Sequence, residues 1–392
     1  MHTVASMQNH SVVYHVDALI SGAIEKAASD IHLEPTAHHL RIRFRVDGLL
    51  YDQPPITSSI MQQVVSRLKV LAQMDIAEKR IPQDGKFTLS FEDKPVDFRV
   101  STFPSLFGEK MVVRILDRAA HAMSLDQLGF APAMLERINE ISQKQSGFFL
   151  VTGPTGSGKT TTLYAILSAL HAPEKNIITL ENPVEYNLEG ITQGHINTEA
   201  GFTFEKGIRA LLRQDPDILM VGEIRDRETA GVAIEAALTG HLVLSTLHTN
   251  DAPSAVMRLM DMGIEPFLIN ASLSGVLAQR LVRKLCLECR EPIERTELHE
   301  HLLKKLSIDE DIQLYAGRGC AWCDGLGYRG RIGIFELLVI NQAFRALIVS
   351  HPDFDAIYEQ VRRDGMHTLL QDGVLKLKEG VISLEELARV MI

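Results

Sequence analysis

The chain has 392 residues, of which 45% are hydrophobic and 23% charged, and its formal net charge is −10 at pH 7. This length predicts two or three domains with buried cores, and the composition is that of an ordinary globular protein. The acidic charge argues against nucleic acid as the main partner, because binding to a phosphate backbone needs a basic surface.

The N-terminal tail, residues 1–16, lacks the basic region and apolar run of a signal peptide. Nowhere do about 18 apolar residues run together, as a membrane-spanning helix requires. We therefore expect a cytoplasmic protein, with docking to the periphery of a membrane left open.

Residues 17–117 predict a small α/β domain, with helices at 18–28 and 64–77, a turn at 82–85 and strands at 41–46, 96–101 and 111–116. The first strand alternates strictly, so Arg41, Arg43 and Arg45 share one face. That face either meets a phosphate or partner, or pairs with carboxylates. Arg99 and Arg114, on the last two strands, are likewise open to a structural ion pair or to a phosphate. Arg114 stands among apolar neighbours, with no acid beside it in the local sequence.

Residues 118–129 predict a linker, and residues 130–392 a nucleotide-binding domain that opens with a helix at 131–142. Next comes a phosphate-binding loop between a buried strand and a helix. It fits G-x-x-x-x-G-K-[ST], in which backbone N–H groups cradle phosphates at a helix N-terminus. Lys159 is expected to reach the β- and γ-phosphates, and the Thr160 hydroxyl to bind Mg²⁺. The expected nucleotide-binding residues are Gly153, Pro154, Thr155, Gly156, Ser157, Gly158, Lys159, Thr160 and Thr161.

Two further buried strands end in carboxylates. The strand at 177–180 leads to Glu181 and Glu185, and the strand at 218–221 leads to Glu223. Ligands of parallel sheets bind at the carboxyl ends of strands. A carboxylate delivered beside a phosphate loop acts on Mg²⁺ or on the attacking water. The alternative is that these carboxylates are only solvated side chains of loops.

The rest of this domain offers arginines, histidines and cysteines. The helix at 204–213 places Arg209 and Arg213 on one face, and a strand within 239–249 has His241 and His248 near its ends. Cys286, Cys289, Cys320 and Cys323 form two C-x-x-C pairs, the pattern of a tetrahedral Zn²⁺ site. We expect a zinc lobe over residues 283–333 and a helical part over 334–392.

Taken together, these motifs resemble the secretion-ATPase superfamily, and more narrowly the assembly ATPases of type II secretion and type IV pili. The resemblance covers nearly the whole chain from about residue 17. The segments that carry it are 28–32, 41–48, 75–80, the phosphate loop, 213–226, 239–250 and the four cysteines.

The resemblance implies a PAS-like N-terminal domain joined to a RecA-like domain in a homohexamer. ATP hydrolysis, with Mg²⁺ and Zn²⁺ as cofactors, would drive a platform protein of the inner membrane that moves pilin subunits. Glu181 with Glu185 resembles the family's Asp box, Glu223 its Walker B acid, and His241 and His248 its His box. Arg99, Arg114, Arg209 and Arg213 match arginines around the phosphates.

This chain departs from the family pattern in two ways. The Asp box normally reads Glu-Asp-Pro, and here Asn182 replaces the aspartate. Most relatives also carry an additional N-terminal domain that docks onto a membrane-complex component, and this chain begins almost directly at the PAS-like domain, which leaves that partner open.

Three alternative functions are a RecA-like ATPase acting on DNA, a pilus-retraction motor and a nucleotide-binding module without turnover. The charge argues against the first. The cysteines argue against the second, because retraction relatives usually lack the zinc lobe. Asn182 keeps the third open.

Overall fold

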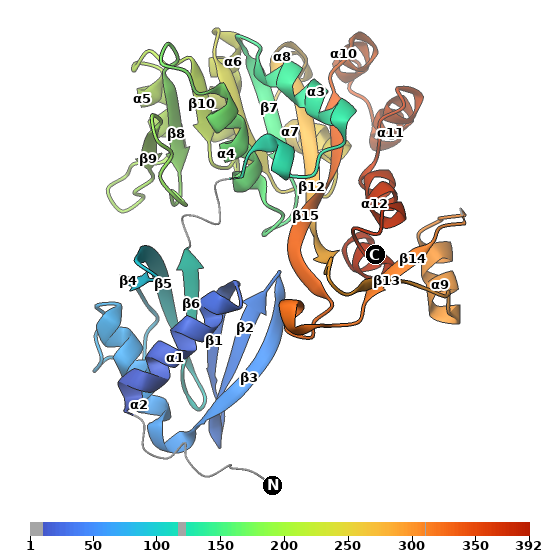
Figure 1. The fold of residues 1–392 in the computed structure, drawn as a ribbon. Coiled ribbons are helices and arrows are strands. Elements are labelled where there is room, and N and C mark those ends of the chain that lie inside the picture. The colour runs from blue at the N-terminus through green and yellow to red at the C-terminus, as the bar shows by residue number, and fades with distance from the viewer. Residues whose placement is uncertain (1–10, 117–122, 310) are drawn as a thin grey trace. The chain divides into compact units, whose positions relative to one another are not determined.

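The computed structural model describes residues 11–116, 123–309 and 311–392, and the chain divides into two compact units, residues 1–121 and 122–392. Each unit has its own sheet and its own hydrophobic core (Figure 1). The described residues confirm the expected mixed α/β fold class.

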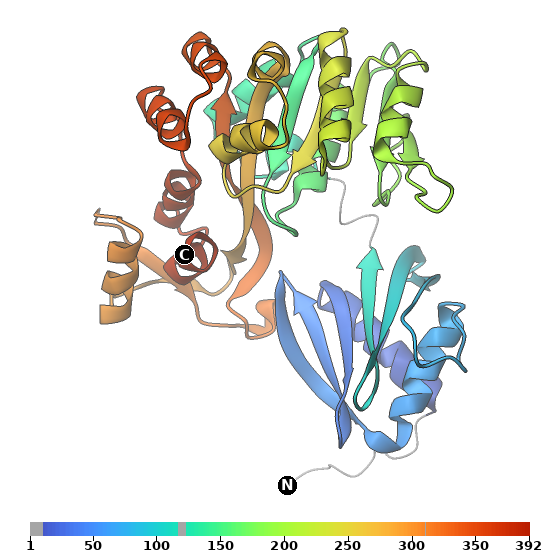
Figure 2. The same cartoon turned by 180° about the vertical axis from the view of Figure 1, so that it is seen from behind.

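The first unit is an antiparallel sheet covered on one face. Its six strands lie in the order β3-β2-β1-β6-β5-β4. Both helices lie on the same face of the sheet, behind the strands in Figure 2. Its elements are α1 (Val12–Glu25), β1 (Ala28–Pro35), β2 (His39–Val46), β3 (Leu49–Thr57), α2 (Ser58–Leu71), β4 (Gln83–Phe91), β5 (Lys94–Ser105) and β6 (Gly108–Leu116).

The core of this unit follows from period-two alternation. Ile42 and Phe44 of β2 are buried against the helices, whereas the alternating Arg41, Arg43 and Arg45 lie on the opposite face. An antiparallel sheet with one covered face and one polar face produces this pattern.

Several expected boundaries in the first unit are wrong. The first helix begins at Val12, within the expected tail, because the Ser11 side chain accepts a hydrogen bond from the Tyr14 N–H group. It ends before Ala27, whose φ of +50° lies outside the helical region. The second helix covers residues 58–71 in place of 64–77, and the turn expected at 82–85 is the start of β4.

The second unit is built on a seven-stranded sheet in the order β15-β12-β7-β11-β10-β8-β9. All neighbouring strands are parallel except β15, which is antiparallel to β12. The strands are β7 (Gly147–Thr152), β8 (Ile177–Glu181), β9 (Thr192–His195), β10 (Ile218–Val221), β11 (Leu242–Leu247), β12 (Leu273–Leu285) and β15 (Tyr328–Val339).

Helices cover both faces of this sheet. One face packs against α3 (Pro132–Ser142) and α4 (Lys159–Leu170). The other packs against α5 (Phe204–Leu211), α6 (Arg227–Leu238), α7 (Ala252–Asp261) and α8 (Pro266–Ser272), which face the viewer in Figure 2. Strands buried on both sides read as continuous apolar runs, which is why their positions were predictable.

The cysteine lobe (residues 283–333) and four C-terminal helices complete the unit. The lobe holds β13 (Arg290–Ile293), α9 (Glu297–Lys305), β14 (Leu314–Gly317) and the short helix η2 (Ala321–Cys323). The helices are α10 (Gln342–Val349), α11 (Phe354–Arg363), α12 (Leu369–Lys378) and α13 (Leu384–Met391). Strand β15 continues to Val339, so the part expected to be helical from residue 334 begins as a strand.

The structure also corrects the expected linker, residues 118–129. Residues 118–122 lie outside the described residues, and the remainder packs onto the second unit. Leu125, in the short helix η1 (Leu125–Gln127), and Leu128 are both buried in the core that contains α3 and α4. Residues 123–129 therefore belong to the nucleotide-binding unit.

Candidate functional site

The phosphate loop joins β7 to α4 in the middle of the sheet. All six residues of β7 are buried, and β11 and β12 flank the strand in parallel. Gly153, Gly156 and Gly158 have φ values of +148°, +79° and +87°, a region that glycine adopts without strain. A Cβ on Gly153 would lie 2.4 Å from the carbonyl oxygen of Gln279, so only glycine fits there.

Gln279 of β12 braces this loop from a position far along the chain. Its Nε2 donates to the Ser157 carbonyl oxygen at 2.6 Å, and its Oε1 accepts from Thr162 Oγ1 at 2.8 Å. Ser157 is buried, and its Oγ has no hydrogen-bond partner within the described residues. A buried hydroxyl without a partner, inside a loop of left-handed glycines, fits a cradle for phosphate oxygens.

Lys159 supplies the cation of this cradle. Its Nζ donates to the carbonyl oxygens of Gly153 and Pro154, at 2.9 and 3.1 Å. Burial lowers the pKa of the Lys159 ammonium, while the nearby charge of Glu223 acts in the opposite direction. The ammonium group is therefore close to both the loop and the acid.

Glu223 lies where β10 ends, next to Arg225 and His248. Its Oε2 is 2.7 Å from Arg225 Nε and 3.7 Å from His248 Nε2. Thr249 N donates to Thr152 Oγ1 at 2.9 Å, which ties the end of β11 to the end of β7 and fixes the neighbouring histidine. Burial and the Lys159 charge lower the pKa of His248, which favours the neutral imidazole, while the charge of Glu223 acts in the opposite direction. The structure thus brings Lys159, Glu223 and His248 together.

Glu181 lies at the end of β8 but is directed into the protein. Its carboxylate accepts from Tyr164 Oη, from Thr179 Oγ1 at 2.5 Å and from Gln193 Nε2 at 3.2 Å. Burial raises the pKa of Glu181, although these three hydrogen bonds act in the opposite direction. Glu185 is half-buried, and its N–H group donates to Tyr164 Oη at 3.4 Å.

One of the expected site residues lies at the opposite edge of the sheet. His241 precedes β11, and its Nδ1 is 2.9 Å from the Ala236 carbonyl oxygen. Parallel strands put their amino ends on one edge and the phosphate loop on the other, and six residues of strand span about 20 Å. His241 therefore does not reach the phosphate loop of its own chain. Arg209 lies in the last turn of α5 and lines a pocket with Arg227 and Glu228 at the start of α6, and Arg213 follows α5.

The arginines of the first unit pair with carboxylates. Arg41 bonds to Asp52 and Arg43 to Glu34, both at 2.7 Å, and Arg45 lies 3.7 Å from Asp30. These pairs support the second of the two interpretations of the basic strand. Asp30 also accepts from Arg114 Nε at 2.9 Å. The acid that local sequence did not offer Arg114 thus comes from the neighbouring strand β1, and Arg99 lies directly across from Arg114 on β5.

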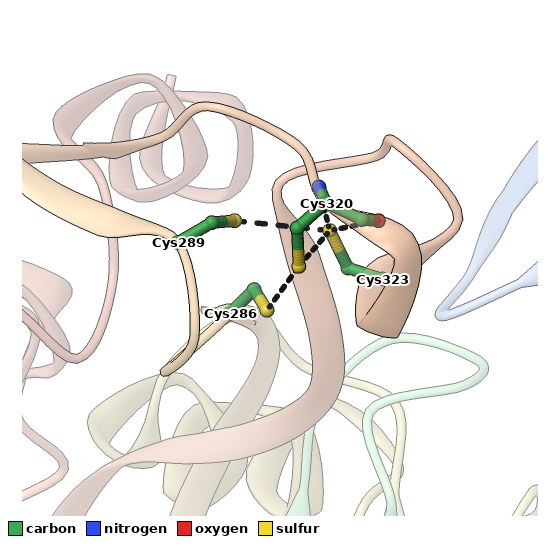
Figure 3. Close-up of side chains that lie close together, drawn as sticks. All are labelled: Cys286, Cys289, Cys320 and Cys323. Atoms are coloured by element: carbon green, nitrogen blue, oxygen red, sulfur yellow. Dashed lines mark hydrogen bonds between the residues drawn. The ribbon is translucent and has the colours of Figure 1, made fainter.

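The four cysteines converge in the cysteine lobe, as Figure 3 shows, although Cys286 and Cys320 are far apart in sequence. Their sulfur atoms all lie within 4.8 Å of one another, and three of the S···S distances are 3.7 to 3.8 Å. A tetrahedral shell with Zn–S bonds of about 2.3 Å has S···S edges of about 3.8 Å, so the donors fit zinc.

Backbone hydrogen bonds favour a thiolate in this cluster. Burial acts against the charged form of Cys323, but the N–H groups of Cys320 and Gly327, both 3.2 Å from its Sγ, help to lower its pKa to about 6. A thiolate is the form that binds a metal ion. Gly319 has a φ of +85°, and a Cβ there would lie 2.5 Å from the Gly325 carbonyl oxygen, so the tight loop needs glycine.

Comparison with known proteins places this geometry in a family. The model of the Type II/IV secretion system protein family matches residues 5–389. The chain is 50% identical over 379 residues to the type II secretion system protein E of Aeromonas hydrophila, covering 97% of this chain and 75% of the relative. It is 47% identical over 381 residues to the type IV pilus assembly ATPase PilB of Thermus thermophilus, covering 96% of this chain and 42% of that protein.

The fold of the chain also matches that of a solved structure. The pilus retraction motor PilT with bound ADP aligns with a TM-score of 0.63 and 27% sequence identity, covering 95% of this chain and 96% of the other. Among the described residues, no helix is both long and apolar enough to cross a membrane. The family match spans nearly the whole chain and both units, and the chain belongs to the type II/IV secretion system ATPase family.

Proposed function

We propose that this chain is a hexameric ATPase that powers assembly of a type II secretion pseudopilus or a type IV pilus at the inner membrane. The observation that carries the proposal is the group of Lys159, Glu223 and His248 at one edge of the sheet, in a chain 50% identical to a type II secretion system protein E.

In this proposal, ATP binds with its phosphates in the loop and each residue has a separate task. Lys159 turns from the loop carbonyls to the β- and γ-phosphates. Thr160 would hold Mg²⁺, which neutralises charge on the phosphates. Glu223 orients the attacking water or accepts its proton. The neutral imidazole of His248, beside Glu223, can accept a hydrogen bond from water or donate one.

The cysteine cluster would hold one structural Zn²⁺. Four thiolates close the tetrahedral shell and leave no open position, so the metal supplies rigidity rather than chemistry. The buried apolar residues described in the lobe, Leu303, Leu306 and Leu314 among them, belong to the core of the whole second unit, and small lobes of this kind often need a metal to remain folded.

The position of His241 at the amino end of β11 supports an oligomer. Since His241 does not reach the phosphate loop of its own chain, any role at the nucleotide requires a second copy. We propose that His241, Arg209 and Arg213 act on a nucleotide bound by a neighbouring subunit in a ring. A platform protein of the inner membrane is the proposed receiver of the motion.

The comparisons also bear on the alternatives. The chain is 27% identical to the retraction motor but 47% identical to a pilus assembly ATPase, which favours assembly over retraction. The cysteine lobe also favours assembly over retraction. The net charge of −10 gives no support to action on DNA.

The test is Mg²⁺-dependent ATP turnover by the purified chain. Lys159→Ala should lose ATP affinity, whereas Glu223→Gln should bind ATP but hydrolyse it at least about 100-fold more slowly. Matched controls are Lys175→Ala and Glu199→Gln, both at exposed positions. Wild-type turnover by Glu223→Gln would contradict the proposed role, and absence of turnover in the wild-type oligomer would contradict the function.

A further inference from the structure

A buried carboxylate that no motif assigns lies between the first residues of two helices in the second unit. Glu336 of β15 is 5% exposed. Its Oε1 accepts a hydrogen bond from the Ala252 N–H group at 2.9 Å, and its Oε2 accepts one from the Leu369 N–H group at 3.2 Å. These residues begin α7 and α12, where N–H groups have no partner within the helix. Glu336 thereby joins the start of α7 to the C-terminal helices.

A tyrosine of the C-terminal helices meets the residue before Ala252. Tyr358 of α11 donates its hydroxyl hydrogen to Asp251 Oδ2 at 2.6 Å, and the same hydroxyl lies 3.2 Å from Ser254 Oγ. Burial and the hydrogen bond to Asp251 raise the pKa of the Tyr358 hydroxyl, so it remains a donor. Asp251 is already the N-cap of α7, since its Oδ1 accepts from the Ser254 N–H group at 2.8 Å. The contact with Tyr358 is therefore additional to what capping requires.

These contacts converge on the loop between β11 and α7, which carries His248. Thr249 Oγ1 donates to the Asp251 carbonyl oxygen at 2.9 Å, and the Thr249 N–H group donates to Thr152 Oγ1 at 2.9 Å. One end of the loop is thus held to the end of β7, and the other end to α7, β15 and α11. The His248 side chain is 48% exposed and lies 3.7 Å from Glu223 Oε2. Because so much of this side chain is exposed, its position depends mainly on the backbone that carries it.

We infer that Glu336 and Tyr358 are positioning residues for hydrolysis, which hold the loop after β11 and so keep His248 in place at the site. The inference rests on the proposed function. The phosphate loop is braced separately, by Gln279, so ATP binding should survive when either contact is lost. Hydrolysis should slow, because a displacement of about 1 Å in a catalytic group can cost roughly 100-fold in rate.

The experiment measures kcat and the KM for MgATP in Tyr358→Phe and Glu336→Gln, alone and combined with His248→Ala. Each of the two changes alone should lower kcat about tenfold and leave KM within about threefold of wild type. In the His248→Ala background neither change should lower kcat further, because the residue through which they act is gone. A purely structural role predicts instead that the losses multiply. Tyr358→Phe alone decides between the two roles if Glu336→Gln does not fold.

Tyr328→Phe is the matched control, because Tyr328 is another half-buried tyrosine, whose hydroxyl lies 2.7 Å from Ser383 Oγ. It should leave kcat unchanged, and all variants are compared at the same oligomeric state. Wild-type kcat in Tyr358→Phe or in His248→Ala, multiplicative losses in their combination, or an equal loss in Tyr328→Phe would each overturn the inference while the wild-type protein still hydrolyses ATP. A wild-type protein without turnover would overturn the proposed function itself.

Discussion

Gln279 is the side chain on which the shape of the phosphate loop depends most. It is 2% exposed, and its amide bridges the Ser157 carbonyl oxygen and the Thr162 hydroxyl, on either side of Lys159. Both ends of the loop are thereby held to β12. Because an amide presents a donor and an acceptor at fixed separation, no apolar side chain can replace both bonds.

Gln279→Met should therefore weaken nucleotide binding. The change keeps a similar volume but leaves a buried carbonyl oxygen and hydroxyl without partners, at about 1–3 kcal/mol for each unsatisfied group. We expect affinity for MgADP, measured by calorimetry, to fall about tenfold. Gln313→Met is the control, since Gln313 Nε2 donates to carbonyl oxygens of Ile293 and Leu314 in the cysteine lobe. Unchanged affinity in Gln279→Met would show that the loop is rigid without the brace.

The difference between Gln279 and Lys159 explains which site residues the sequence could predict. Lys159 and Glu223 stand in local patterns, a glycine-rich loop and the end of an apolar strand, and both patterns can be recognised within a few residues. Gln279 and Tyr358 act through contacts that only the folded unit creates. The sequence predicted that His241 and His248 lie near the two ends of one strand, and the structure has them at opposite ends of β11; only the resemblance to the His box grouped them.

At the scale of elements, a buried ion pair joins α2 to β6 in the first unit. Lys69 Nζ lies 2.7 Å from Glu109 Oε1 and 2.6 Å from the Glu78 carbonyl oxygen, and the two side chains are 1% and 5% exposed. The pair therefore also anchors the irregular segment 74–82. An exposed pair of the same chemistry would contribute little to stability. Here both charges are buried, so removing one would leave the other buried without a partner.

Lys69→Met should destabilise the first unit by about 3–5 kcal/mol, because it leaves the Glu109 carboxylate buried without a partner. Hydrogen exchange of the β6 amides in the full chain measures this loss. The control is Arg41→Met, whose partner Asp52 is 62% exposed, and which should leave the exchange of the β6 amides unchanged because an exposed pair contributes little to stability. Equal effects of the two changes would mean that the buried pair is replaceable.

The cysteine lobe should bind about one Zn²⁺ per chain. Cys286→Ser or Cys320→Ser removes a thiolate from the shell, so zinc content should fall and α9 and β13 should lose protection from proteolysis. Metal analysis of freshly purified protein measures the first effect and limited proteolysis the second. Leu287→Ser is the control, because Leu287 lies between two of the cysteines and is 75% exposed. Full zinc content in Cys286→Ser would contradict the assignment.

The boundaries of elements were predictable only where the apolar pattern was strong. The buried strands β7, β8 and β10 begin within a residue of their predicted positions, because continuous apolar runs mark them. Residues 82–85 carry turn chemistry and predict a turn, but Gln83 to Gly85 form the start of strand β4. Its pairing with β5 determines the conformation instead, and that pairing is a tertiary contact.

At the scale of the whole molecule, the open face of the first unit carries a row of charges across five strands. Cross-strand pairing aligns Arg45, Asp30, Arg114, Arg99 and Lys86, in that order. Residues directly opposite each other share a face of the sheet. The row holds four cations and one carboxylate, and the Arg114 side chain is 59% exposed despite its bond to Asp30. This is a surface that favours an anion.

The final prediction concerns whether this row takes part in hydrolysis. As the γ-phosphate leaves, negative charge builds up at the nucleotide, and an arginine that meets it is worth roughly 10³–10⁵ in rate in other phosphate-loop enzymes. We propose that Arg114, assisted by Arg99, supplies this charge in the assembled protein. Arg114→Ala should then keep ATP affinity within about threefold and lower kcat about 10³-fold, with a smaller loss in Arg99→Ala.

The bond to Asp30 makes a purely structural role the competing explanation, and two further variants separate them. Asp30→Asn removes the acid while leaving both arginines in place, so a structural role predicts that it lowers stability and kcat as Arg114→Ala does. A role at the phosphates predicts that kcat survives in Asp30→Asn and is lost in Arg114→Ala, even when both melt at similar temperatures. Arg41→Ala, on the same face, controls for loss of positive charge. Wild-type kcat in Arg114→Ala would show that the row of charges does not act on the nucleotide.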